Sequence, residues 1–125
     1  MKNILVVTIV VICMMGFSSC FHHHNLSVTI QDDADEYEMD ASFAKRQTKM
    51  VQQYLNKNLL TYENGWYKND LEDKAITIDD NTTFVIDASP GELTVRIDKT
   101  ENPEHSYKKI KQVCQDIKNL LVENE

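Results

Sequence analysis

The stretch TTFVIDASPGELTVRID, residues 82–98, decides the fold of this chain. On both sides of its centre, apolar residues alternate with polar ones, which is the period of a strand with one buried face. Between the two halves, Ser89-Pro90-Gly91-Glu92 places proline and glycine at the central positions of a type II turn. The stretch therefore predicts an antiparallel hairpin of strands 82–88 and 92–98 with one apolar face.

The same alternation recurs in three upstream segments. Residues 26–31, 36–43 and 75–79 carry apolar side chains at every second position, and Asp32-Asp33-Ala34 joins the first two segments as a turn. In the three later strands the expected inward residues are Ile76, Ile78, Phe84, Ile86, Leu93, Val95 and Ile97. A sheet that is apolar on one face needs only one covering layer.

Two amphipathic helices are expected to supply that layer. Residues 44–59 repeat apolar positions at helical spacing, with Ser42 as the expected cap. Asn102-Pro103 is expected to open a second helix, with Asn102 as its cap and proline at its first position. The apolar stripe of this second helix consists of Tyr107, Ile110, Val113, Cys114, Ile117, Leu120 and Leu121. The predicted fold is an α+β two-layer sandwich of order β-β-α-β-β-β-α. It has a mainly antiparallel five-stranded sheet and two helices on one face, with strand order left open.

The first twenty residues have a different character. Lys2 precedes an apolar run over residues 4–15, which is too short for a bilayer span of roughly 20 residues. The run is followed by Gly16-Phe17-Ser18-Ser19-Cys20. This order resembles the lipobox of bacterial lipoproteins, where signal peptidase II cuts before a cysteine that carries diacylglycerol, although Phe17 stands where Leu is usual. The alternative is an ordinary secretory signal with a chance cysteine.

The resemblance implies how the chain is divided into segments and where the protein is located in the cell. Residues 1–19 would be the signal peptide, 20–25 a lipidated tether and 26–122 a single domain. Cys20 would carry acyl chains such as palmitate, and two or three chains give stable membrane attachment. The signal is similar to those of small uncharacterised lipoproteins of the Bacteroidota. No aspartate follows Cys20, so the implied location is the outer membrane, facing the periplasm.

Composition narrows the function classes. Loss of residues 1–19 leaves 12 basic against 20 acidic side chains, and this acidity disfavours nucleic-acid binding. With only Gly65 and Gly91 in the mature chain there is no glycine-rich phosphate loop, so we expect no nucleotide cofactor. His105 and Ser106 are adjacent on a helix and do not face each other, so we expect no serine-nucleophile enzyme.

Histidine and cysteine offer one weak metal candidate. His22, His23 and His24 have metal-ligand chemistry, but a structural zinc site fixes four ligands on a rigid frame. A polar spacer is the favoured interpretation of the three histidines. Cys13 leaves with the signal and Cys20 takes the lipid, so Cys114 is the remaining thiol, and we expect it to be buried on its apolar stripe.

Charge and exposed aromatics suggest where a partner would bind. Glu36, Glu38 and Asp40 are expected on the open sheet face, and Trp66 and Tyr67 in a hairpin around Asn64-Gly65. The basic residues expected on the helices are Lys45, Arg46, Lys49, Lys57, Lys108, Lys109, Lys111 and Lys118. The leading hypothesis is a non-catalytic interaction or accessory module of the cell envelope, meeting an envelope protein or lipopolysaccharide. The alternatives are a metal-binding lipoprotein that uses His22–His24 and a small periplasmic hydrolase.

Overall fold

The computed structural model describes residues 19–23, 26–60, 71–78 and 82–125, and of residues 19–23 it describes the backbone. The elements are β1 (Ser19–His23), β2 (Leu26–Asp32), β3 (Glu36–Ser42), the 3₁₀ turn η1 (Lys45–Gln47), α2 (Thr48–Asn58), β4 (Leu71–Ile78), β5 (Thr82–Ser89), β6 (Glu92–Asp98) and α3 (Glu104–Glu123). Residues 1–18 of the expected leader, His24 and the predicted Trp66–Tyr67 hairpin lie outside the described residues.

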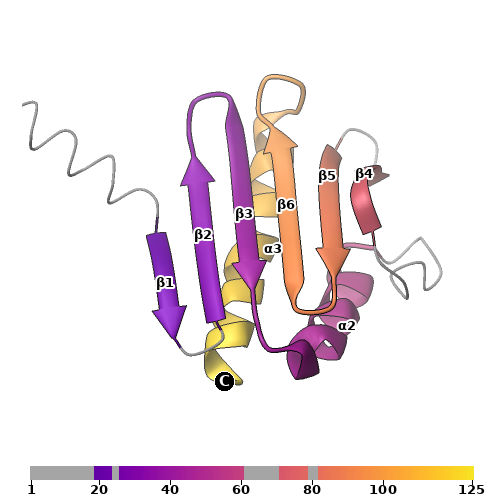
Figure 1. The fold of residues 1–125 in the computed structure, drawn as a ribbon. Coiled ribbons are helices and arrows are strands. Elements are labelled where there is room, and N and C mark those ends of the chain that lie inside the picture. The colour runs from indigo at the N-terminus through magenta and orange to yellow at the C-terminus, as the bar shows by residue number, and fades with distance from the viewer. Residues whose placement is uncertain (1–18, 24–25, 61–70, 79–81) are drawn as a thin grey trace, which may run out of the picture.

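The strands form one antiparallel sheet in the order β1-β2-β3-β6-β5-β4 (Figure 1). The hairpins β2–β3 and β5–β6 meet where β3 pairs with β6, from Glu36 opposite Asp98 to Ser42 opposite Glu92. β1 and β4 are the two edges. The predicted α+β fold is confirmed, and β1 is a sixth strand that was not expected.

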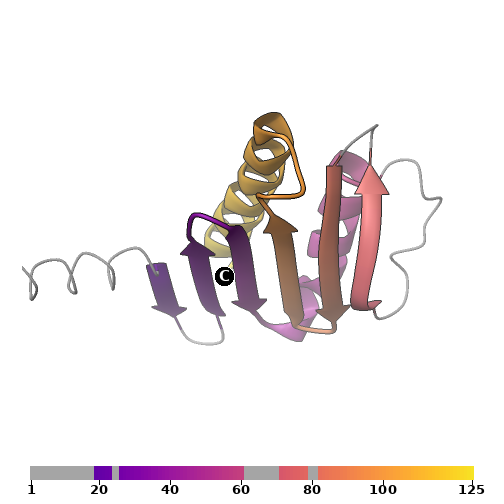
Figure 2. The same ribbon diagram turned by 90° about the horizontal axis from the view of Figure 1, so that it is seen from above.

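Both helices cover the same face of the sheet, as Figure 2 shows from above. α3 packs across β2, β3 and β6, while α2 lies beside it toward β5. All seven predicted inward residues of β4, β5 and β6 are buried, and so is the α3 stripe except for Tyr107 and Leu120, which are half-buried. The opposite face of the sheet has no covering element among the described residues.

The two predicted turns have clear local causes. Asp33 Oδ1 accepts hydrogen bonds from the backbone N–H groups of Asp35 (2.9 Å) and Glu36 (2.8 Å), which fixes the β2–β3 turn. Gly91 has φ +80°, as position three of a type II turn requires, and its N–H donates to Thr48 Oγ1 at 2.9 Å. A Cβ at Gly91 would lie 2.8 Å from the Phe43 carbonyl oxygen, so this position is restricted to glycine.

The predicted helix caps were wrong. Ser42 is the last residue of β3, and neither α2 nor α3 has a side-chain cap at its first turn. The Asn102 side-chain amide instead binds the backbone of β5 and β6. It accepts a hydrogen bond from the Thr83 N–H and donates to the carbonyls of Thr83 and Asp98. Buried Gln47 acts at the other end of α3, where it donates to the carbonyls of Leu121 and Asn124.

The segment expected to be a tether differs from the structure over most of its length. The backbone of β1 pairs with β2 along all five of its residues, with Ser19 opposite Ile30, Cys20 opposite Thr29 and His23 opposite Leu26. Pairing with an existing strand orders this segment, although its sequence lacks a clear alternation. Cys20 therefore lies within the sheet and not on a tether ahead of it.

Candidate functional site

The open face of the sheet concentrates negative charge. Residues of β3, β5 and β6 alternate between the core and this face, as their burial patterns show. The outward carboxylates on these three strands are Glu36, Glu38, Asp40, Asp87, Glu92 and Asp98. Arg96 is the one basic residue in these strands. Glu36 and Asp98 lie directly opposite each other in the ladder, and hydrogen bonds from the Thr100 hydroxyl and N–H to the Asp98 carboxylate hold the pKa of Asp98 below its usual value.

Arg96 only partly balances this charge. Its Nε lies 3.6 Å from Glu38 Oε1 on β3, and its Nη2 lies 3.3 Å from Asp73 Oδ1 on β4. Burial raises the pKa of Glu38, the neighbouring Asp40 raises it further, and Arg96 opposes the rise. Asp40 accepts a hydrogen bond from Thr94 Oγ1 at 2.7 Å. The centre of the face therefore holds carboxylates that an external cation would stabilise.

A shallow hollow of about 270 Å³ lies beside this acidic centre. Its lining includes Ser27 and Thr29 from β2, Asp40 and Ser42 from β3, and Thr94 from β6. Glu92 of β6 also lines the hollow, so the hydroxyl groups and two carboxylates of the lining offer hydrogen-bond acceptors and rotatable donors. The hollow suits a polar or cationic side chain better than an apolar one.

The helical layer carries the opposite charge. Lys45, Arg46, Lys49 and Lys57 are exposed on η1 and α2, and residues 45–58 contain no acidic side chain. α3 is nearly balanced, because its four lysines accompany Glu104, Asp116 and Glu123. The predicted two-sided charge distribution is therefore present, with its basic part concentrated on η1 and α2.

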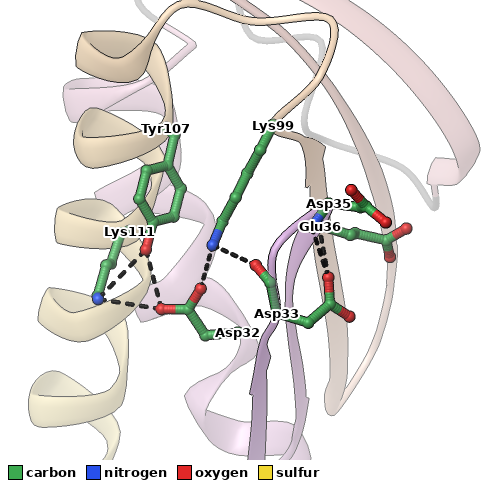
Figure 3. Close-up of polar contacts among 7 residues, drawn as sticks. All are labelled: Asp32, Asp33, Asp35, Glu36, Lys99, Tyr107 and Lys111. Atoms are coloured by element: carbon green, nitrogen blue, oxygen red, sulfur yellow. Dashed lines mark hydrogen bonds and ion pairs between the residues drawn. The ribbon is translucent and has the colours of Figure 1, made fainter.

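A polar cluster joins the β2–β3 turn, the β6–α3 loop and α3 (Figure 3). Asp32 accepts from Lys99 Nζ through one carboxylate oxygen, and from the Tyr107 hydroxyl (2.9 Å) and Lys111 Nζ (3.1 Å) through the other. Lys99 also donates to the Asp33 carbonyl and lies 4.2 Å from the centre of the Tyr107 ring. Tyr107 in turn meets the buried Tyr37 ring edge-on, with 6.0 Å between centroids.

The charged groups of this cluster are paired with one another. Burial alone would raise the pKa of Asp32, but hydrogen bonds from Lys99, Tyr107 and Lys111 outweigh it and hold the pKa below its usual value. Burial would lower the pKa of Lys99, and Asp32 raises it instead. Each charge has a partner within the molecule, so the cluster stabilises the end of the sheet and does not present a reactive group.

Four other residues have side chains capable of nucleophilic or acid–base chemistry, and the structure places each of them. Cys114 is fully buried as predicted, and burial raises the pKa of its thiol to about 12, so it stays protonated. Ser106 is buried and its hydroxyl receives a hydrogen bond from Thr82, while neighbouring His105 is exposed. The Tyr54 hydroxyl donates to Asp116 at 2.9 Å, and burial followed by Asp116 raises the pKa of Tyr54 to about 12.

The predicted metal binding and the predicted membrane attachment both concern the N-terminal part of the chain. Within the described ranges no three His, Cys, Asp or Glu side chains are grouped to hold a metal ion. His22 and His23 are described only as backbone of β1, and His24 is outside the described residues, so the triple-histidine hypothesis stays a prediction. None of the helices in the described part of the chain has the length and apolarity to cross a bilayer.

Sequence reasoning placed Glu36, Glu38 and Asp40 on one face correctly, while Trp66 and Tyr67 lie outside the described residues. It missed Thr94 and Arg96, which complete the face from β6. The alternation of β6 showed that both residues point outward, but only the strand order shows that they lie beside β3. Comparison of the chain with family models, curated proteins and solved structures gave no match.

Proposed function

We propose that this protein is a lipid-anchored, non-catalytic interaction module of the bacterial cell envelope, attached through Cys20 and binding a basic protein partner with its open sheet face. Lipid attachment is supported by the Lys2, apolar-run and Ser-Ser-Cys20 pattern. The outer membrane, with the domain facing the periplasm, is the location that this pattern favours.

The single observation that carries the binding proposal is the excess of carboxylates over basic side chains on the open face formed by β3, β5 and β6. Three carboxylates, Glu36, Glu38 and Asp40, follow one another along β3, and across the ladder they meet Asp98, Arg96 and Thr94. The raised pKa of Glu38 shows that its charged form is unfavourable in the isolated domain, where burial and the neighbouring Asp40 both oppose ionisation. A cationic partner would stabilise the charged form and would be attracted from a distance.

A protein is favoured over lipopolysaccharide as the ligand of this face, because lipopolysaccharide phosphates are anionic and would be repelled by it. Lipopolysaccharide would suit the basic η1–α2 surface instead. The proposal therefore assigns the protein partner to the open sheet face and not to the basic η1–α2 surface.

The test is site-specific crosslinking in cells that express the full chain with its native leader. A photoreactive amino acid at Thr94 on the open face should form an adduct with an envelope protein, and one at Gln112 on the exposed side of α3 should not. The double variant Glu38→Gln/Asp40→Asn should lose most of the Thr94 adduct, while the matched double variant Glu104→Gln/Glu123→Gln on α3 should retain it. Equal adducts from Thr94 and Gln112, or no effect of the sheet variant, would contradict the proposal.

A further inference from the structure

We infer that the mature protein has no spacer between its lipid and its fold, so that the β1 edge of the sheet rests directly on the bilayer surface. This inference rests on the proposed lipidation of Cys20 and specifies how the domain meets the membrane. Its basis is the position of Cys20 within a paired strand.

The register of β1 leaves no free chain at the anchor. Cys20 is opposite Thr29 and His23 is opposite Leu26, so pairing extends from the expected first residue of the mature chain almost to the start of β2. Neighbouring strands lie about 4.8 Å apart, which puts the backbone of Cys20 roughly that distance from β2. A lipid on Cys20 therefore holds the sheet itself and not the end of a linker.

Two of the three ways of resting on a bilayer conflict with this geometry. If the helical layer lay flat on the membrane, the helices, about 10–12 Å in diameter, would hold Cys20 at least that far above the headgroups. The diacylglycerol is bonded to the cysteine sulfur, so Cys20 must lie at headgroup level. If the open face lay down, Glu36, Glu38 and Asp40 would meet the anionic surface.

In the remaining orientation the sheet is upright and its β1 edge contacts the bilayer. This strand is at one edge, and its outer side presents backbone groups that no other described strand pairs with. Headgroups and interfacial water would cover that side. β4 lies five strand spacings away, roughly 24 Å, and would be the part of the sheet farthest from the bilayer. The acidic open face would then point sideways, where a protein partner can reach it.

Depth-dependent quenching tests this orientation with the lipidated protein in vesicles of phosphatidylethanolamine and phosphatidylglycerol. Gln31→Cys on β2 and Thr77→Cys on β4 introduce exposed labelling sites, and buried Cys114 should not react. A fluorophore at residue 31 should be quenched several-fold more strongly by headgroup-labelled lipid than one at residue 77. A ten-residue Gly-Ser insertion after Cys20 is the control, and it should abolish the difference.

The mass of the N-terminal peptide separates the two proposals. A peptide without acyl chains would overturn the proposed lipid anchor. With the acyl chains present, equal quenching at residues 31 and 77 would overturn only the edge-on orientation. Energy transfer between labels at residue 31 of two copies, with no quenching by the lipid, would also overturn the edge-on orientation. In that case a second copy of the chain, and not the bilayer, would cover the β1 edge.

Discussion

The covered face and the open face of this sheet differ in how fully their charged side chains are paired within the molecule. On the covered side and its rim, charges are paired within the molecule, as Asp32 is with Lys99 and Lys111. On the open side, Arg96 is shared between Glu38 and Asp73, and Glu36 lies opposite Asp98. Accordingly the pKa of Asp32 is lowered by its partners and that of Glu38 is raised by burial and by Asp40.

This difference separates groups that maintain the fold from groups that suit a partner. Removing a satisfied charge leaves its partners without a counter-ion, so it should lower stability. Removing a crowded charge relieves repulsion, so it should cost little stability while weakening binding. Removing a carboxylate should therefore lower the free energy of unfolding on the covered side and raise it on the open side.

The largest effect is expected in the covered core. Cys114→Asp buries an unpaired carboxylate among Ile110, Ile117 and the inner sheet face, and should cost several kcal/mol of unfolding free energy. The same new charge at exposed Asn119 on α3, Asn119→Asp, is the matched control and should change stability by less than about 0.5 kcal/mol. Denaturant titration followed by circular dichroism measures both. Similar stabilities of the two variants would show that the stripe is not packed.

Asp32→Asn should have the next largest effect, a loss of about 1–2 kcal/mol at pH 7, because Lys99 and Lys111 lose their shared carboxylate. The lowered pKa of Asp32 stabilises the fold above the unfolded value of 3.8, and this contribution disappears as the pH falls through the folded pKa. The gap between wild type and variant should therefore close in acid. Asp33→Asn keeps an oxygen that can accept the turn hydrogen bonds, so it should lower stability at pH 7 less than Asp32→Asn does.

Tyr37→Phe should raise stability by about 1 kcal/mol. The Tyr37 hydroxyl is buried and has no hydrogen-bond partner among the described residues, and burial raises the pKa of this phenol. Phenylalanine keeps the ring contact with Tyr107 and removes the unsatisfied group. Thermal unfolding is a suitable measurement, with Tyr54→Phe as the control that should lower stability because it loses the bond to Asp116. A lower melting temperature for Tyr37→Phe would contradict this interpretation.

Glu38→Gln should have the smallest effect on stability, a gain of up to about 0.5 kcal/mol at pH 7. Because folding raises the pKa of Glu38, the wild type recovers stability as the pH falls through the raised pKa, and below 4.5 the gain from the substitution should vanish. Urea unfolding at pH 7 and pH 4 measures the difference. A loss of stability at pH 7 would mean that the pair with Arg96 outweighs the repulsion from Asp40.

Local pattern was enough to predict five strands, both helices and the side of the sheet that they cover. Alternation in residues 82–98 and helical spacing around Cys114 each depend on neighbours along the chain. The caps were wrong for a related reason. Asn102 matches a capping position locally, but its amide is engaged by Thr83 on β5.

Long-range features could not be predicted. The Asp32 links to Lys99 and Lys111 join residues 67 and 79 positions apart, and only the strand order β2-β3-β6 brings them together. β1 was missed because Ser19–His23 lacks alternation and is ordered by pairing with β2. The same strand order places Arg96 and Thr94 beside Glu38 and Asp40 on the candidate binding face.

Metabolic labelling with a fatty-acid analogue tests the lipid anchor, on which the envelope role and the orientation both depend. Wild type expressed with its own leader should incorporate label and fractionate with the outer membrane. Cys20→Ser should incorporate none and accumulate as an uncleaved precursor, because the thiol is the acyl acceptor. Equal labelling of wild type and Cys20→Ser, or none of either, would contradict the account.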